Sequence, residues 1–164
     1  MSPKPNWSKG SFLALAISLS LCFAVGLFGA QFPPGAWYER LAKPVFTPPN
    51  AVFGPVWTAL YVMMGVAAWL VWKRSGLRGA AGSLSLYVAQ LSLNAAWTWL
   101  FFGLRRPDLA LANIFVLWVA ILVTAIAFWR HHVRAGVLFV PYFLWVSFAV
   151  YLNYSFWQLN RSLT

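Results

Sequence analysis

Aromatic and amide side chains recur at helical spacing in three apolar stretches of the sequence. Residues three or four positions apart share one face of a helix, so each stretch presents a stripe of rings with a few amides. Indole N–H and amide groups donate to a carboxylate or carbonyl, and flat rings suit a large planar ligand. The stripes consist of Phe53, Trp57 and Tyr61, then Gln90, Asn94, Trp97 and Phe101, and finally Trp145, Ala149 and Asn153.

The three stripes are predicted to meet at one level. Trp57, Asn94 and Ala149 each lie seven or eight residues from the end of their apolar stretch, which corresponds to a depth of about 10–12 Å at the rise of a helix. A ligand pocket with aromatic walls and polar groups is one interpretation. Plain packing is the alternative, because aromatic stripes fill helix interfaces and a membrane Asn often only joins two helices.

These stretches offer little for acid–base chemistry. None of them carries Asp, Glu, Lys, Arg or His in its middle, so we predict no catalytic residue, no metal site and no cofactor. His131 and His132 are adjacent, so they do not share a helical face, and no Cys or acid accompanies them. They are predicted to be loop residues at the membrane interface. The single Cys22 cannot form a disulfide within this sequence.

Composition places the stripes in a membrane protein. Hydrophobic residues make up 62% of the 164 residues and charged residues 9%, which is unlike a soluble domain of this size. Two acids face twelve Lys and Arg, for a net charge of +10. The basic residues form short clusters between apolar stretches, as in loops beside membrane helices, so we predict no nucleic-acid partner.

Five apolar stretches are long enough to cross a bilayer, because about 20 helical residues span its hydrocarbon core. They predict an all-α protein, a single five-helix transmembrane domain over residues 1–164. The first stretch is long for a signal peptide, and bulky Phe28 occupies a position where signal-peptide cleavage requires a small residue. We therefore expect the first stretch to be retained. Seven basic residues on the N-terminal side against five on the other favour a cytoplasmic N-terminus in a bacterial cell membrane. The predicted helices cover 11–30, 50–72, 82–102, 109–129 and 136–157.

One long connection separates the first two predicted helices. It mixes proline, charge and aromatic residues, among them Trp37 and Pro44, inside an otherwise apolar chain. Compact folds seldom keep so long a structureless segment unless it covers a site. We therefore predict a Pro-rich lid over the pocket, with Trp37 and Pro44 among the ligand-binding residues.

Several spaced motifs follow one another along the chain. They are Trp37-Tyr38-x-x-Leu41-x-Lys43-Pro44, Gly54-Pro55-Val56-Trp57-Thr58-x-Leu60-Tyr61, Gln90-Leu91-x-Leu93-Asn94-x-x-Trp97, Pro141-Tyr142-x-x-Trp145 and Phe148-Ala149-x-x-Leu152-Asn153-Tyr154. Together they resemble the tryptophan-rich sensory protein family, which includes the mitochondrial translocator protein, or peripheral benzodiazepine receptor. The resemblance implies a five-helix membrane protein, usually dimeric, that binds porphyrins such as protoporphyrin IX and, in animal members, cholesterol and synthetic ligands. It carries ligand contacts over to Trp57, Asn94, Trp97, Trp145 and Ala149.

The resemblance also implies a sensor or regulator of tetrapyrrole and stress responses. Two alternatives stay open: a transporter of porphyrin or sterol, and a slow light- or oxygen-dependent porphyrin-degrading enzyme that uses Trp57 and Trp145. A proton-coupled transporter would be expected to hold an acid or a His at mid-membrane. Indole radicals need no titratable group, so the sequence does not separate binding from slow turnover.

Small residues line the opposite face of the third predicted helix. Ser85, Ala89, Ser92 and Ala96 fall about 160–220° from Asn94 around the helix axis. Helices approach closely in lipid where residues are small. The stripe predicts a homodimer through this helix, and packing against another helix of the same chain is the alternative.

Overall fold

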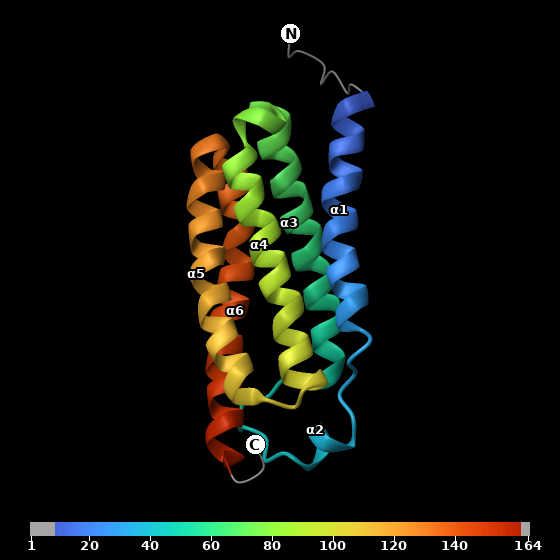
Figure 1. Ribbon diagram of the computed structural model, residues 1–164, viewed down its shortest axis with the longest axis vertical. Helices are drawn as coiled ribbons and strands as arrows, with labels where there is room; N and C mark the ends of the chain where they lie inside the picture. Colours follow the sequence, from blue (N-terminus) through green and yellow to red (C-terminus); the bar gives the residue numbers. More distant parts are fainter. Residues whose placement is uncertain (1–8, 162–164) are drawn as a thin grey trace.

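Helices account for the regular structure of residues 9–161, the part of the chain that the structure describes, and no strand occurs there. In this computed structural model five long helices run along one axis and a short helix, α2, lies at one end of the bundle (Figure 1). Residues 1–8 and 162–164 of the predicted domain lie outside the described part. The elements are α1 (Lys9–Gly29), α2 (Ala36–Arg40), α3 (Asn50–Gly79), α4 (Ala81–Thr98), the π-helical turn η1 (Trp99–Gly103), α5 (Pro107–His131) and α6 (Val133–Leu159).

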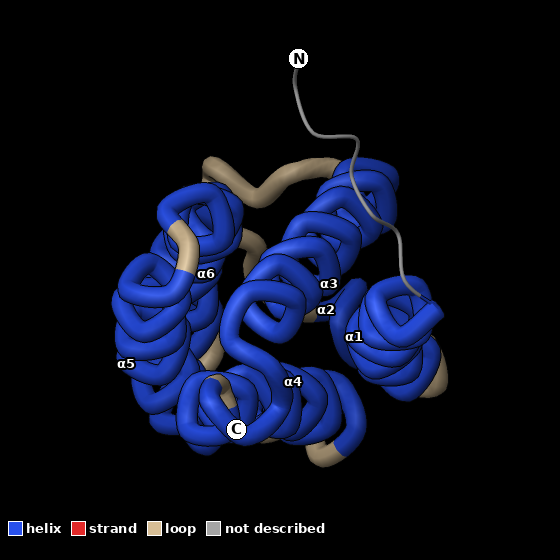
Figure 2. Tube along the Cα trace, turned by 90° about the horizontal axis from the view of Figure 1, so that it is seen from above, coloured by secondary structure: helices blue, strands red, loops and turns tan. Residues whose placement is uncertain are grey.

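Seen along the bundle, α1 lies beside α3 and α4, while α5 and α6 pack together on the opposite side (Figure 2). In addition, α3 packs against α6, and α4 packs against α5. The core between the helices is apolar, with Met64, Ile121 and Phe139 completely buried. The three helices that carry the predicted stripes, α3, α4 and α6, therefore belong to one packed core.

Four helices are long and apolar enough to cross a membrane. Helix α4 is not one of them, because Gln90, Asn94 and several serines dilute its apolar residues. The described helices therefore include four candidate spans, and a fifth span stays a prediction. The candidates are Gly10–Gly29, Asn50–Gly79, Pro107–His131 and Val133–Leu159, with mean hydropathies of 2.3, 1.6, 2.6 and 1.9.

Large apolar side chains cover the outside of the bundle as well as its core. Leu13, Leu27 and Leu144 expose 62%, 71% and 62% of their surface. Soluble monomers rarely present extended apolar surface of this kind. Such an exterior is what lipid tails would contact, in agreement with the candidate spans.

The second predicted helix ended at residue 72, but α3 continues to Gly79. Gly76 has φ +67° and ψ 172°, a non-helical conformation that glycine adopts without steric cost. The chain therefore kinks at Gly76 and turns into α4 through Ala80. The third predicted helix ends in η1, where the N–H of Leu104 bonds to the carbonyl of Trp99 at 2.8 Å.

The loop predicted between the fourth and fifth helices shrinks to one residue, His132. Its N–H donates to the Phe128 carbonyl at 2.8 Å, and its own carbonyl accepts the N–H of Ala135 at 2.9 Å. A Cβ added at Gly136 would lie 2.7 Å from the Trp129 ring, so the glycine permits this close return of the chain. Helices α5 and α6 thus form a tight hairpin.

His131 is part of a helix, and the loop position predicted for it is wrong. It is the last residue of α5, and its ring reaches the turn between α3 and α4. Its Nδ1 lies 2.7 Å from Oγ of Ser75, and its Nε2 lies 3.0 Å from Oγ of Ser83. The ring therefore ties three helices together at the end of the bundle opposite α2.

Helix α1 approaches α3 closely at Gly65. A Cβ added there would lie 2.6 Å from Cδ2 of Leu19 and 3.2 Å from its Cα. A second tie joins α1 to α4, because the Tyr87 hydroxyl donates to the carbonyl of Ser18 at 2.9 Å and contacts the Cys22 thiol at 2.9 Å. The close approach of α1 to α3 therefore depends on the absence of a side chain at Gly65, whereas hydrogen bonding joins α1 to α4.

We expect Gly65→Leu to destabilise the protein by about 1–3 kcal/mol, because the new side chain would force α1 away from α3. Thermal unfolding in detergent, followed by helical circular dichroism, measures the effect. Gly82→Leu in α4 is the control, since a Cβ at Gly82 meets nothing within 4 Å. Equal melting temperatures for the two variants would contradict close packing of α1 on α3.

Candidate ligand site

Asn94 lies at the centre of the candidate site and is 3% exposed. The hydroxyl of Tyr61 on α3 donates to its Oδ1 at 3.2 Å. Its Nδ2 in turn donates to the hydroxyl of Tyr142 on α6 at 3.1 Å. The helical spacing predicted for α3 and α4 thus places Tyr61 and Asn94 together, and one amide joins three helices.

Aromatic rings surround this amide. The Trp57 ring lies 5.5 Å from that of Tyr61 and meets that of Tyr142 edge-on at 6.1 Å. One helical turn before Trp57, Phe53 packs edge-on against Trp145 of α6 at 5.8 Å. The sequence-predicted rings of α3 and α6 therefore form one continuous wall, as expected for the edge-on contacts that aromatic side chains prefer.

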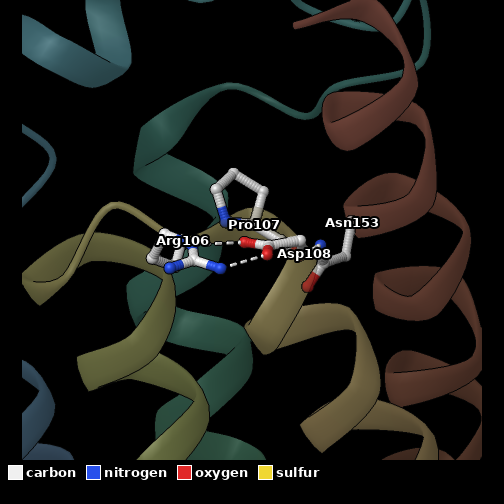
Figure 3. Close-up of polar contacts among 4 residues, drawn as sticks. All are labelled: Arg106, Pro107, Asp108 and Asn153. Carbon is white, nitrogen blue, oxygen red and sulfur yellow. Dashed lines mark hydrogen bonds and ion pairs between the residues drawn. The ribbon is translucent and has the colours of Figure 1, made fainter. Parts of the chain in front are cut away.

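Asn153 organises a second polar contact, closer to α2. It accepts a hydrogen bond from Nε1 of Trp97 at 2.9 Å and donates from Nδ2 to the carbonyl of Pro107 at 2.9 Å. Figure 3 shows Asn153 reaching from α6 toward the first residues of α5, beside the ion pair of Arg106 and Asp108. Trp97 and Asn153 therefore fix α4, α5 and α6 relative to one another.

A stack of rings continues from Trp97 to α2. Trp97 stacks on Phe101 at 5.4 Å, and Phe101 meets the Trp37 ring edge-on at 5.9 Å. Trp37 is thereby brought next to the predicted stripe of α4, although it lies in the connection between α1 and α3. Burial raises the pKa of the neighbouring Tyr38 phenol, while the Lys43 ammonium opposes that rise.

The remaining predicted residues occupy the margins of the site. Ala149 is partly buried against the core. Gln90 is completely buried beside Met64, with Nε2 3.8 Å from the sulfur, and no described residue bonds to its Oε1. Pro44 is buried in the α1–α3 connection, where its carbonyl accepts two bonds from Thr47. Asn94 and Asn153 are thus the two amides that join helices around the aromatic rings.

Sequence reasoning missed Tyr142 and Asn160. Tyr142 belongs to the Pro141-Tyr142-x-x-Trp145 motif and lies about one helical turn before Trp145. Its contact with Asn94 could not be predicted, because it depends on how α4 and α6 pack. Asn160 follows the end of the last predicted helix, where a polar residue gives no pattern. Only burial distinguishes it, because just 2% of its surface is exposed.

Asn160 clamps the connection between α1 and α3 (residues 30–49) to the end of α6. The Ala42 N–H donates to Oδ1 of Asn160 at 2.8 Å, and Nδ2 donates back to the Ala42 carbonyl at 3.0 Å. Nδ2 also donates to the Phe156 carbonyl at 2.8 Å, which holds the amide in place. One side chain therefore fastens this connection next to the ring stack.

Comparison with known proteins assigns this arrangement to a family. Residues 16–158 match the family model described as TspO/MBR family. The chain belongs to the TspO/MBR family. The match includes α3, α4 and α5 completely, most of α1 and α6, and the predicted site residues from Trp37 to Asn153.

Relatives in this family share much of the chain. "Tryptophan-rich protein TspO" of Chlorobaculum tepidum is 43% identical over 155 residues, which cover 90% of this chain and 96% of the relative. "Tryptophan-rich sensory protein" of Cereibacter sphaeroides is 42% identical over 142 residues, covering 87% and 88%. "Translocator protein" of Homo sapiens is 38% identical over 162 residues, covering 96% and 93%. With its four candidate spans, this TspO/MBR member is a multi-pass integral membrane protein.

We expect Asn160→Ala to loosen residues 41–49, because it removes both hydrogen bonds to Ala42. Each bond contributes about 1 kcal/mol, so amide exchange at Ala42 should accelerate roughly tenfold or more. Hydrogen exchange with mass spectrometry in detergent measures the change. Gln158→Ala is the control, since Gln158 bonds only to the exposed Tyr154 hydroxyl among the described residues. Unchanged exchange in the Asn160 variant would contradict the clamp.

Proposed function

We propose that this protein binds porphyrins, protoporphyrin IX among them, and related hydrophobic ligands between α3, α4 and α6. The observation that carries the proposal is Asn94, a buried amide bonded to two tyrosines within an aromatic wall. Flat rings provide area for a macrocycle, and the amide and hydroxyls provide donors and acceptors that orient it. The connection of residues 30–49 acts as the lid of this site.

Binding would exchange one set of hydrogen bonds for another. Asn94 Nδ2 now donates to Tyr142, and a ligand acceptor such as a carbonyl oxygen or a ring nitrogen could take that donor. A ligand that cannot replace the bond would leave a buried polar group unpaired, at a cost of about 1–3 kcal/mol. The site would therefore prefer a planar ligand that carries its own hydrogen-bond acceptors, such as the imine nitrogens of a porphyrin ring.

The names of the relatives bear on the role. "Sensory" in the name of the relative from Cereibacter sphaeroides supports a sensor or regulator, for which we propose tetrapyrrole and stress responses. "Translocator" in the name of the human relative supports the alternative of a transporter, with porphyrin or sterol as the proposed cargo. Trp57 and Trp145 both face the seam between α3 and α6. This placement keeps slow light- or oxygen-dependent porphyrin breakdown as a further alternative.

Two features of assembly belong to the proposal. Helix α4, extended by η1, serves as the fifth membrane span, because the two together reach the length of about 20 residues that a bilayer needs. The protein also forms a homodimer through the outer face of α4. Ser85, Ala89 and Ser92 are exposed there, which argues against burial by another helix of the same chain.

We expect Asn94→Leu to weaken protoporphyrin IX binding about tenfold, the effect of losing one buried hydrogen bond to a charged or polar partner. Fluorescence quenching of the purified protein measures affinity. Asn113→Leu is the control, because Asn113 donates to the Leu93 carbonyl outside the site. Unchanged affinity in a folded Asn94 variant would remove Asn94 from the site.

A titration repeated in light and in darkness separates stable binding from bleaching of the porphyrin. Only bleaching that disappears in the Trp57→Phe variant favours an enzyme.

We expect Ala89→Leu combined with Ser92→Leu to yield a monomer in mild detergent, because bulky residues would hold two α4 helices apart. The variant should still bind protoporphyrin IX, since Asn94 lies on the opposite face. Ala112→Leu combined with Val116→Leu places two leucines on the exposed face of α5 and is the control. Size-exclusion chromatography with light scattering gives the mass. A mutant that remains dimeric would exclude this face as the interface.

A further inference from the structure

A hollow of about 300 Å³ opens between α2 and the turn that joins η1 to α5. Figure 1 shows these two segments side by side at the end of the bundle where the chain finishes. Trp37, Leu41 and Phe102 give the hollow an apolar floor, and Arg40 and Arg105 also line it. The hollow thus combines aromatic surface with two exposed guanidinium groups.

Both acids of the chain are already paired with other cations. Glu39 accepts from Nζ of Lys43 at 3.0 Å, and Asp108 receives Arg106 through Nε and Nη2 at 2.8 and 2.5 Å (Figure 3). The sequence contains no further Asp or Glu. No side-chain carboxylate therefore remains to neutralise Arg40 and Arg105, and the hollow carries a local excess of positive charge.

The backbone at Arg105 is unusual. Its φ of 57° lies in the left-handed region, where a residue other than glycine costs about 1–2 kcal/mol. The next residue, Arg106, donates its N–H to the Leu100 carbonyl at 3.0 Å, which holds the turn. The turn is therefore strained at Arg105. A glycine would relieve the strain, but it would place no guanidinium at the hollow.

The floor of the hollow is firmly packed and continuous with the candidate site. The ring of Tyr38 lies 5.6 Å from that of Phe102 and 5.5 Å from that of Phe156. Trp37 meets Phe101, which stacks on Trp97, the donor to Asn153. One stack of rings therefore leads from the hollow to the polar groups between the helices.

We infer that this hollow binds the carboxylates of an amphiphilic aromatic ligand, a site that rests on the function proposed above. Arginine matches carboxylate geometry with paired donors, and two such groups suit a ligand with two acidic side chains. The volume of the hollow lies at the lower limit of the roughly 300–1,000 Å³ that is typical of small-molecule pockets. It therefore receives the acidic edge of the ligand, while the ring system contacts the aromatic stack.

The test compares protoporphyrin IX, which has two carboxylates, with its dimethyl ester. Affinities are measured for the parent and for Arg40→Gln combined with Arg105→Gln, in nanodiscs of phosphatidylcholine. Arg74→Gln combined with Arg78→Gln removes the same charge at the opposite end of the bundle and is the control. The parent and the control should prefer the acid about tenfold, and the Arg40 and Arg105 variant should lose that preference while still binding the ester.

The outcomes separate this inference from the proposed function. Ester binding retained in the variant shows that it is folded and that the inner site is intact. Equal affinity of the parent for acid and ester, or equal loss of preference in the control, overturns the hollow as a carboxylate site and leaves porphyrin binding standing. Failure of the parent to bind either compound overturns both. A preference that disappears in phosphatidylglycerol nanodiscs assigns the two arginines to lipid phosphate instead and overturns the inference.

Discussion

Asn94 is buried and has both a donor and an acceptor on its amide, and both find partners on other helices. Tyr61 supplies the donor and Tyr142 the acceptor, and this sets the relative rotation of α3, α4 and α6. A helix turned by one residue would move its partner by about 100° and leave a buried polar group unpaired. In an interior built almost entirely from apolar side chains, such bonds define the register that apolar packing alone leaves loosely fixed.

Similar pairs recur along the bundle, each joining different helices. Tyr87 binds the Ser18 carbonyl of α1, and Asn153 links Trp97 of α4 to Pro107 of α5. The proposed ligand site is thus made of the same groups that hold the helices together. Ligand binding and helix packing would therefore compete for the same donors, and a ligand that satisfies them would also change the forces between the helices.

The sequence was informative where the spacing or composition of a single helix determines the structure. Spacing along α3 and α4 predicted the stripes that bring Tyr61 and Asn94 together, and length with hydropathy predicted five spans, of which four are candidate spans in the described part of the chain. Predictions from the sequence failed where the structure depends on the backbone conformation of one residue or on a contact between distant segments. Helix α3 continues past residue 72 through a kink at Gly76, η1 (Trp99–Gly103) is π-helical, and His131 belongs to a helix instead of a loop. Tyr142 and Asn160 acquire their partners only through the packing of segments distant in sequence.

The hairpin of α5 and α6 has a consequence for biogenesis. With His132 alone between them, the adjacent ends of the two helices are held together by a single residue, beside the basic Arg130 and Arg134. The N–H groups of His132, Ala135 and Gly136 bond to carbonyls within the hairpin itself. The two helices must therefore take neighbouring places in the membrane, so we expect α5 and α6 to insert as an antiparallel pair.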